Sequence, residues 1–456
     1  MKITPEIFRA YDIRGIADEQ FDEEFAYHLG LAFGSRLKPG GSISVGYDCR
    51  TTSQKYSLAL EEGLANTGLN IIRIGMCPTP LLYFSIFSDH LDGGIMVTGS
   101  HNPSEYNGFK MCVGQGSLYG DEIQKLKVVI ENKEYRKGKG TIQNRDESIV
   151  DSYISHIHSR FPILLKNKKN PIKVILDAGN GMAGLVAPQL IKSLGFEVSE
   201  LFCDVDGTFP NHHPDPTVPE NLKELIARVH EEKADVGIAY DGDADRIGVI
   251  SDTGEVIWGD TLLTLFAKEI YNENKSVSVI GEVKCSDSLY EVVNKIGGTA
   301  IMWKTGHSFI KEKLKIEKAD IAGEMSGHIF FKDRYFGYDD AIYASVRLLE
   351  ILVRQNKKVS ELISPFPKYF STPEIRVPFD DREKFKVVEK LKTFFSNKYP
   401  LISIDGIRIQ FGDGWGLVRP SNTQPVLVLR FEAKTKDRLL EIQKEVETAL
   451  KEVVAS

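Results

Sequence analysis

The chain is poor in cysteine. Its five cysteines are spread between positions 49 and 285 of 456 residues, and no two of them form a C-x-x-C pair. This number and spacing exclude a disulfide framework and a paired-cysteine zinc site, and they are typical of reduced thiols in a cytoplasm. Apolar runs are also short, since none approaches the roughly 20 residues that span a bilayer. The N-terminus, Met1-Lys2-Ile3-Thr4, lacks the features of a signal peptide. The sequence therefore predicts a cytoplasmic protein that does not bind a membrane.

The chain also has fewer basic residues than acidic ones. The 57 lysines and arginines are outnumbered by 64 acidic residues, which gives a net charge of −7. A nucleic-acid-binding protein needs a basic face to neutralise phosphates, so we predict no nucleic-acid partner. Any phosphate-binding site must be a local cluster of cations in an otherwise acidic protein.

Length and pattern predict several domains. With 456 residues, 42% of them hydrophobic, the chain is too long for a single core. Apolar strand-like runs such as Ser42–Tyr47 and Lys173–Asp177 alternate with helical stretches such as Ala183–Leu194, which indicates successive α/β units. Beyond Pro367, short strands and two helices follow in an order typical of a small α+β domain. The predicted domains are residues 1–150, 151–253, 254–366 and 367–456.

The segment 241–246, DGDADR, follows an apolar strand-like run. If the segment is extended, alternate positions point the same way and Asp241, Asp243 and Asp245 converge. Three neighbouring carboxylates cannot all ionise cheaply without a cation, and hard divalent ions take oxygen ligands. An EF-hand is excluded because Arg246 stands where that loop needs glycine, and Asp252 where it needs glutamate. The pattern favours a divalent-cation site over a solvated acidic turn.

A second candidate site is the segment 98–103, TGSHNP, after the apolar strand Gly94–Val97. Ser100, at a strand end beside His101, can project into a cleft. The nucleophile elbow G-x-S-x-G is absent, and neighbours in sequence seldom form a catalytic dyad, so a hydrolase is not indicated. Lys110 adds a cation a short loop away. A plain turn built on Gly, Asn and Pro is the alternative.

Two later segments carry groups that suit hydroxyls and phosphate. In 323–328, GEMSGH, two glycines frame Glu324, Ser326 and His328, which offer donors and acceptors for sugar hydroxyls. In 419–425, RPSNTQP, the fork of Arg419, two hydroxyls and an amide make a good phosphate cradle, with Arg430 beyond it. The segments 9–15, RAYDIRG, and 304–308, KTGHS, are weaker signals. Each segment alone could be an ordinary polar turn.

Taken together, these segments resemble the α-D-phosphohexomutase family, in particular its phosphomannomutase/phosphoglucomutase branch. The matching motifs run in order along essentially the whole chain: FRAYDIRG at 8–15, TGSHNP at 98–103, DGDADR at 241–246, TGHSFIK at 305–311, GEMSGH at 323–328 and RPSNTQP at 419–425. Any one could arise by chance, but all of them in this order are specific. The resemblance implies an α/β fold with four domains around a central cleft. Three are related α/β domains with mixed sheets, and the C-terminal one is a smaller α+β domain.

The resemblance also implies roles for single residues. Ser100 would be the phosphoserine and would hold Mg²⁺ together with Asp241, Asp243 and Asp245. The segment 323–328 would recognise the sugar, and 419–425 would hold the non-reacting phosphate. The groups implied near the chemistry are His101, Lys110, Arg14 and His307, and the resemblance does not decide which one is the general acid or base. Substrate contacts are expected from Tyr11, Arg246, Lys284, His307, Glu324, Met325, Ser326, Gly327, His328, Arg419, Pro420, Ser421, Asn422, Thr423 and Arg430. One small departure is Glu282, where the family pattern leads us to expect Asp.

The implied chemistry is a phosphoryl transfer in two halves. The phosphoserine gives its phosphoryl group to a hexose monophosphate, and the resulting hexose 1,6-bisphosphate turns over in the cleft and returns its other phosphate to the serine. The predicted enzyme interconverts the 1- and 6-phosphates of mannose, glucose or both. It would use Mg²⁺ and a bisphosphate activator, as a monomer or weak homo-oligomer. Three alternatives stay open: a phosphoglucosamine mutase, which Met325 disfavours by resemblance; a phosphatase with Asp241 as nucleophile; and a non-catalytic sugar-phosphate sensor.

Overall fold

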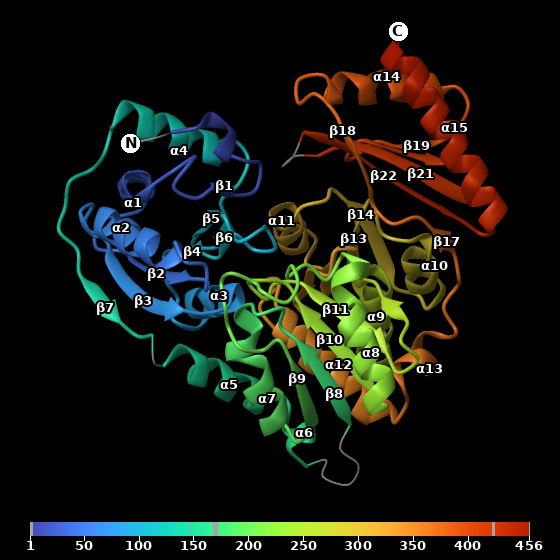
Figure 1. Cartoon of the computed structure of the whole chain (residues 1–456), viewed down its shortest axis with the longest axis horizontal. Coiled ribbons are helices and arrows are strands. Elements are labelled where there is room, and N and C mark those ends of the chain that lie inside the picture. Colours follow the sequence, from blue (N-terminus) through green and yellow to red (C-terminus); the bar gives the residue numbers. More distant parts are fainter. Residues whose placement is uncertain (1–2, 147, 167–171, 422–424, 456) are drawn as a thin grey trace.

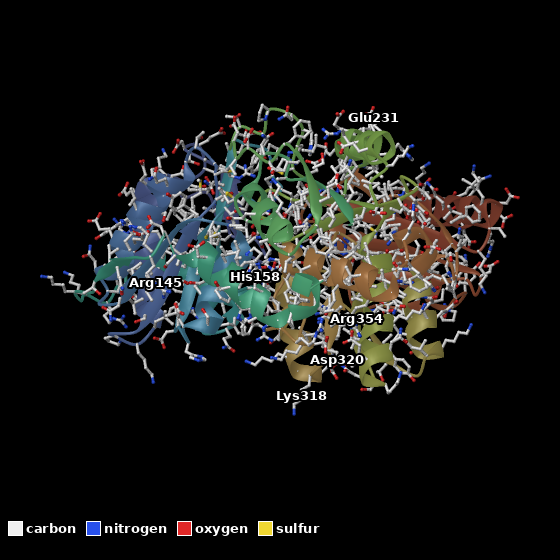
Figure 2. The ribbon with its side chains drawn as sticks, turned by 90° about the horizontal axis from the view of Figure 1, so that it is seen from below. Arg145, His158, Glu231, Lys318, Asp320 and Arg354 are labelled. Carbon is white, nitrogen blue, oxygen red and sulfur yellow. The ribbon has the colours of Figure 1, made fainter. Side chains whose placement is uncertain are left out.

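Four sheets form the frame of the molecule, one in each of four successive parts of the chain. In Figure 1 the first part (blue) lies at the left and the C-terminal part (red) at the upper right, with the others between and below them. Figure 2, seen from below, shows the same two parts at opposite ends, with Arg354 of α12 (Ala341–Gln355) near the middle. The computed structural model describes residues 3–146, 148–166, 172–421 and 425–455.

The first domain is a mixed sheet covered by helices on both faces. In β4 (Gly93–Val97), Ile95 and Val97 pack with α1 (Glu23–Arg36), α2 (Ser53–Ala65) and α4 (Asp121–Asn132), whereas Met96 packs with α3 (Thr79–Ser88). This alternation follows from the two-residue period of a strand. The strand order is β1 (Ile13–Ile16), β5 (Tyr106–Val113), β4, β2 (Ser42–Tyr47), β3 (Asn70–Met76) and β7 (Ile142–Asn144), with β6 (Gly116–Ser117) beside β5.

The second and third sheets repeat the central pattern of the first. In space the order is β3-β2-β4-β5, then β9-β8-β10-β11, then β14-β13-β15-β16. In each set the first three strands are parallel and the fourth is antiparallel. The prediction of three related α/β domains with mixed sheets is confirmed. The bounds are β8 (Lys173–Asp177), β9 (Glu197–Leu201), β10 (Val236–Tyr240), β11 (Ile247–Ser251), β12 (Val256–Ile257), β13 (Ser278–Glu282), β14 (Thr299–Trp303), β15 (Ile321–Gly323) and β16 (Ile329–Phe331).

This repeat gives three functional segments the same place in their sheets. The connection from the third to the fourth strand of each set is 98–105, 241–246 and 324–328. Each therefore begins at the carboxyl end of a buried parallel strand, which is where open α/β sheets bind ligands.

The C-terminal domain is an antiparallel sheet with helices on one face, as predicted. Leu391 and Phe395 of α14 (Lys384–Ser396) and Ile442 and Val446 of α15 (Lys436–Ala455) share its core. On the opposite face Trp415 packs against the third domain. The strand order is β17 (Phe370–Ser371), β22 (Val426–Ala433), β21 (Gly414–Pro420), β20 (Ile407–Gln410) and β19 (Leu401–Ile402), with β18 (Ile375–Pro378) also beside β22.

The hydrophobic cores do not follow the four domains one to one. One cluster of buried apolar side chains runs from α3 through α5 (Ile149–Arg160) and the second sheet into α9 (Gly259–Asn274) and α12. The C-terminal domain has a separate core of its own. The first three domains are thus joined through apolar packing, whereas the fourth meets them across a smaller contact. Among the described residues, no helix is both long and apolar enough to cross a membrane.

One predicted element is wrong. The stretch Ala183–Leu194 is not a single helix: a 3-10 turn, η2 (Met182–Leu185), precedes α7 (Ala187–Ser193). Pro188 explains the break, because proline has no N–H and fits only the first turn of a helix. The remaining helices are η1 (Pro5–Ile7), α6 (Pro162–Lys166), η3 (Pro219–Leu222), α8 (Lys223–Glu232), α10 (Asp287–Lys295), α11 (His307–Glu317) and α13 (Val359–Ile363).

Candidate active site

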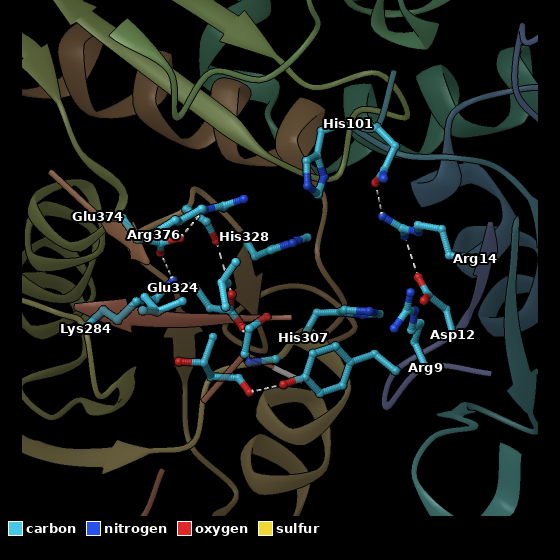
Figure 3. Close-up of a pocket in the computed structure, with 18 of the residues that line it drawn as sticks. Arg9, Asp12, Arg14, His101, Lys284, His307, Glu324, His328, Glu374 and Arg376 are labelled. Carbon is cyan, nitrogen blue, oxygen red and sulfur yellow. Dashed lines mark hydrogen bonds and ion pairs between the residues drawn. The ribbon is translucent and has the colours of Figure 1, made fainter. Parts of the chain in front are cut away.

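A cavity of about 430 Å³ opens between the four domains (Figure 3). Figure 3 shows Arg14 and Asp12 on one side of it, facing Lys284 and Glu374 on the other. Arginines and lysines outnumber carboxylates in its walls, so the cavity attracts anions although the chain is acidic. The lining residues are Arg9, Tyr11, Asp12, Arg14, His101, Asn102, Tyr106, Arg246, Lys284, Thr305, Gly306, His307, Glu324, Ser326, His328, Glu374, Arg376, Arg419, Ser421, Pro425, Val426 and Val428.

Ser100 is buried beside the lining residue His101, in a strained backbone conformation. Its φ is 50°, in the left-handed region that is costly for a residue with a side chain. Its hydroxyl Oγ donates to Asp241 Oδ2 at 3.0 Å and lies 3.2 Å from His101 Nδ1. The side chains of the adjacent serine and histidine are therefore in contact. The strain orients a buried hydroxyl toward the carboxylates of the second domain.

Arg50 holds the loop that carries Ser100 in place through hydrogen bonds to its backbone. Its guanidinium donates to the carbonyls of Ser100 (2.8 Å) and Tyr106 (3.1 Å), and also to those of Asn102 and Pro103. Its Nε donates to a carboxylate oxygen of Asp48. Because Arg50 is buried, these bonds hold the loop in an environment where an unpaired carbonyl would be costly.

The three aspartates converge through a turn, and the prediction of an extended segment is wrong. After β10 the chain turns with Ala244 at a φ of 62°. Asp241 Oδ1 accepts from the backbone N–H groups of Asp245 (3.0 Å) and Arg246 (3.1 Å), which closes the turn. The carboxylates of Asp241, Asp243 and Asp245 offer ligand atoms within 4.8 Å of one another, and all three residues are buried.

The triad fits a divalent cation. Oδ1 of Asp243 and Oδ1 of Asp245 are buried and have no hydrogen-bond partner in the described part of the chain. Burial, followed by the charges of Asp245 and Asp243, raises the pKa of Asp241 well above its usual value, which reflects repulsion that a cation would relieve. Lys110 Nζ donates to Asp243 Oδ2 at 2.6 Å and to Asp245 Oδ2. The Oδ1 atom of each carboxylate is then available to bind a cation. An all-oxygen set of this kind suits Mg²⁺.

A neighbouring cluster of Asp245, His328 and Asp339 is a poorer metal site. Arg246 Nε donates to His328 Nε2 at 2.9 Å, so that ring nitrogen carries no proton. The proton of a neutral imidazole then lies on Nδ1, which is 3.0 Å from Asp339 Oδ2 and 3.4 Å from Asp245 Oδ1. A proton therefore occupies the position that a metal would need. The neutral imidazole of His328 thus directs its Nδ1–H toward the carboxylate of Asp339.

A second histidine approaches the same carboxylate. His307 Nδ1 lies 3.9 Å from Asp339 Oδ2, and its ring stacks on that of His328 with 5.6 Å between centroids. Burial and the charge of Lys311 lower the pKa of His307 well below its usual value. Burial and the charge of Arg246 do the same for the pKa of His101. At neutral pH both rings are neutral and able to accept a proton.

The loop between β15 and β16 presents alternate residues to the cavity. Glu324 Oε1 accepts from the N–H of Gly306 at 2.9 Å, and its Oε2 accepts from Ser326 Oγ at 3.1 Å. Gly327 has a φ of 96°, and a Cβ there would lie 2.3 Å from the carbonyl oxygen of Ile247. Glycine at 327 thus lets the loop pack against β11 while Glu324 and Ser326 face inward.

Cations of the third and fourth domains form the opposite wall. Arg419 Nε donates to Asp405 Oδ2 at 3.0 Å, and Lys284 Nζ donates to Glu374 Oε2 at 3.0 Å. Each cation is paired and held in place, and both belong to the wall of the cavity. Guanidinium and ammonium groups are the protein's usual donors to phosphate.

Four sequence models that describe the domains of phosphoglucomutase/phosphomannomutase match the chain. Alpha/beta/alpha domains I, II and III match residues 5–137, 151–254 and 258–369, and the C-terminal domain matches 374–449. The chain belongs to the phosphoglucomutase/phosphomannomutase family.

Individual members of the family are similar along their whole length. The phosphomannomutase/phosphoglucomutase of Pseudomonas aeruginosa is 45% identical over 455 residues, covering 99% of this chain and 96% of the relative. The phosphoglucomutase of Neisseria gonorrhoeae is 44% identical, covering 97% and 96%. The crystal structure of a phosphoglucomutase/phosphomannomutase family protein from Burkholderia thailandensis has a TM-score of 0.91 at 42% identity, covering 99% of this chain and 98% of that one.

Most residues expected in a phosphoglucomutase/phosphomannomutase site reach the cavity. Those in its wall are Tyr11, Arg14, His101, Arg246, Lys284, His307, Glu324, Ser326, His328, Arg419 and Ser421. Ser100, Lys110 and the aspartate triad are buried. The described walls do not include Met325, Gly327, Pro420 or Arg430. Arg430 instead donates to the carbonyl of Lys284 and lies 3.4 Å from Asp260, so it joins the C-terminal sheet to the third domain. Asn422 and Thr423 lie outside the described residues.

Sequence reasoning missed several site residues. Asp339 and Asp405 belong to no matched motif, and no local signal in the sequence identifies them. Arg50 lies three residues beyond the end of the strand β2, and its side chain reaches the same sheet edge as Ser100. The cavity-wall residues that no motif contained are Tyr106, Glu374, Arg376, Val426 and Val428. Others lie in the matched motifs but were given no role of their own: Arg9, Asp12, Asn102, Thr305, Gly306 and Pro425.

Proposed function

We propose that the chain is a mutase that interconverts hexose 1-phosphate and hexose 6-phosphate, of mannose, glucose or both, through a phosphorylated Ser100. The observation that carries this proposal is the contact of Ser100 Oγ with Asp241 Oδ2 at 3.0 Å, beside a buried triad of carboxylates and next to a cavity with cationic walls. A phosphoryl group on Ser100 would lie between a cation site and a bound sugar. Full-length similarity to enzymes named phosphomannomutase/phosphoglucomutase supports the same reaction.

In the first half-reaction a hydroxyl of the bound monophosphate attacks the phosphorus on Ser100. The bond from phosphorus to Oγ breaks, a bond to the sugar oxygen forms, and the hydroxyl proton ends on Oγ. Neutral imidazoles suit this proton transfer, and His307 and His101 are both neutral at pH 7. Lys110 suits it less, because its pKa is raised by Asp243 and Asp245 despite burial, so it stays a cation. The second half-reaction reverses these bonds at the other end of the hexose 1,6-bisphosphate.

The remaining groups bind and orient. Mg²⁺, held by Asp241, Asp243, Asp245 and the phosphoserine, would neutralise charge on the transferring group. We infer that Glu324 and Ser326 bind sugar hydroxyls. The non-reacting phosphate is bound by Lys284 and Arg419, with Tyr11, Arg14 and Arg246 nearby. Asn422 and Thr423 belong to this cradle by family resemblance alone. The protein's contribution is then mainly placement, which lowers the entropy cost of each transfer.

We also propose a monomer or weak homo-oligomer in a reducing cytoplasm, activated by hexose 1,6-bisphosphate. The cavity walls come from a single chain, and the five cysteines are free thiols.

The working domain boundaries remain 1–150, 151–253, 254–366 and 367–456. Each of the four family models falls within one of these segments to within a few residues, which supports them.

Mutase assays with a matched pair of serine variants test the proposal. The protein is incubated with Mg²⁺, a trace of hexose 1,6-bisphosphate and mannose, glucose or glucosamine 1-phosphate, and the 6-phosphate is followed by ³¹P NMR. Peptide mapping then locates the phosphate. Ser100→Ala should lose both turnover and labelling, whereas Ser104→Ala, an exposed position in the same loop, should keep both.

Two outcomes would contradict the proposal. Release of inorganic phosphate with labelling of Asp241 would indicate a phosphatase. Binding of phosphosugars with neither labelling nor turnover would indicate a sensor. A preference for glucosamine 1-phosphate would keep the mechanism and change the substrate.

A further inference from the structure

The backbone of Thr305 is a junction of three domains. From the first domain, Tyr11 Oη donates to its carbonyl oxygen at 2.8 Å. From the C-terminal domain, Asp405 Oδ2 accepts from its N–H at 3.0 Å. Within the third domain, its Oγ1 donates to Glu282. Thr305 precedes His307 by two residues, so these bonds set the position of the histidine loop.

One carboxylate oxygen of Asp405 accepts hydrogen bonds from two domains. The Oδ2 atom that accepts from Thr305 also accepts from Arg419 Nε at 3.0 Å, within its own domain. Both side chains are largely buried, at 10% exposed for Asp405 and 6% for Arg419. A hydrogen bond to a carboxylate in such a place is stronger than one between neutral groups. The orientation of Arg419 and the docking of the domain therefore depend on the same atom.

The two bonds respond differently to movement of the C-terminal domain. That domain has its own core, and it also contacts the third domain through Arg408, which donates to the carbonyls of Val283 (2.7 Å) and Cys285 (2.9 Å). The contact of Asp405 with Thr305 crosses a domain boundary, whereas its contact with Arg419 lies within the C-terminal domain, so a rigid displacement of that domain breaks the first and keeps the second. The contact with Thr305 therefore depends on the docked position of the C-terminal domain.

We propose that Asp405 is a positioning residue that couples closure of the C-terminal domain to the orientation of Arg419 and of the loop that carries His307. This inference rests on the proposed mutase function. In the closed state Asp405 holds the cradle arginine and docks on Thr305, so the cavity keeps its ligand. In the open state the hydrogen bond between Asp405 and Thr305 is broken. A mutase needs this coupling most between its two transfers, when the bisphosphate must turn over without leaving.

The test measures escape of the bisphosphate. Enzyme labelled with ³²P on Ser100 is mixed with unlabelled hexose 1-phosphate, and labelled bisphosphate free in solution is counted against labelled 6-phosphate. Asp405→Asn keeps the size of the side chain and removes its charge. We expect the escaping fraction to rise about tenfold, which corresponds to a loss of about 1.4 kcal/mol. KM should rise more than kcat falls, since holding the ligand is affected before the chemistry.

Two further variants separate positioning from stability. Asp413→Asn removes a carboxylate that accepts from Arg438 at 3.0 Å in the same domain, and it should leave the escaping fraction unchanged. Asp405→Glu retains the charge and should recover part of the loss.

The idea is overturned if Asp405→Asn lowers Tm but keeps the escaping fraction of the wild type, or if both Asn variants behave alike. A wild-type enzyme that never becomes labelled on Ser100 would instead overturn the proposed function on which the inference rests.

Discussion

The most informative single change is Arg50→Lys. The guanidinium of Arg50 donates to Asp48 and to four backbone carbonyls of the serine loop. An ammonium group can donate at most three hydrogen bonds, and not in a planar fork. The charge is kept, so any effect reports the lost geometry of the loop.

The size of the effect follows from the acceptors left without a partner. At least two of them lose a donor, and each buried orphan costs about 1–3 kcal/mol. Relaxation of the loop recovers a part, so we expect a loss of about 3 kcal/mol in the free energy of unfolding. At about 2 °C per kcal/mol for a large domain, Tm should fall by about 6 °C. Because the loop carries Ser100 at a φ of 50°, its phosphorylation should slow far more than stability alone explains.

Arg136→Lys is the matched control. Arg136 also donates to backbone carbonyls, those of Thr67 (2.8 Å), Gly34 (2.9 Å) and Leu37, but it lies outside the cavity wall. Because an ammonium group can still donate to three acceptors, Arg136→Lys should lower Tm by less than Arg50→Lys, and it should leave serine phosphorylation near the wild-type rate. Calorimetry and the kinetics of ³²P transfer from hexose 1,6-bisphosphate measure the two effects. Equal rates of phosphorylation in both variants would refute the claim that Arg50 positions the loop that carries Ser100.

Three further predictions concern the cavity. Asp243→Asn removes one charge of the triad and should weaken Mn²⁺ binding, measured by electron paramagnetic resonance, together with turnover; unchanged affinity would make the carboxylates structural. Glu324→Gln removes a charged acceptor worth about 1.5–3 kcal/mol, so kcat/KM should fall roughly 10- to 100-fold for both sugars while the serine is still phosphorylated. Burial raises the pKa of Glu374, but Lys284 and Arg376 more than offset this, so its pKa lies below the usual value. Its contribution to stability is present above about pH 4.5 and is lost as pH falls, and Glu374→Gln should flatten the decline of Tm between pH 5 and pH 3.

The sequence was most informative where a signal is local. The strands at 42–47, 173–177 and 236–240 could be placed from apolar runs alone, because a buried parallel strand needs a continuous stretch of apolar residues. The division into α/β units and an α+β tail followed from the order of such runs. The break before α7 was missed, although Pro188 was visible in the sequence, because the apolar periodicity continues across it.

The site could be predicted only in part. Motifs identified Ser100 and the aspartates, but the turn that gathers the aspartates depends on hydrogen bonds from their own backbone and not on strand alternation. Asp405 lies 100 residues from Thr305 in the chain, and nothing in either local sequence announces the contact. Arg430 follows a cradle motif but bonds across a domain boundary. Contacts between distant segments are set by packing, which a local pattern does not contain.

The repeated strand order has a consequence for how such enzymes can diversify. The loop of Ser100, the acidic triad and the loop 324–328 each fill the same turn of a separate sheet, between its third and fourth strands. Each turn has its own pair of strands, but Ser100 bonds Asp241 and Arg246 bonds His328, so only positions outside these contacts, such as Ser326, can be exchanged without disturbing another turn. A lineage could therefore acquire a new sugar by altering one hairpin while inheriting its phosphoryl chemistry intact.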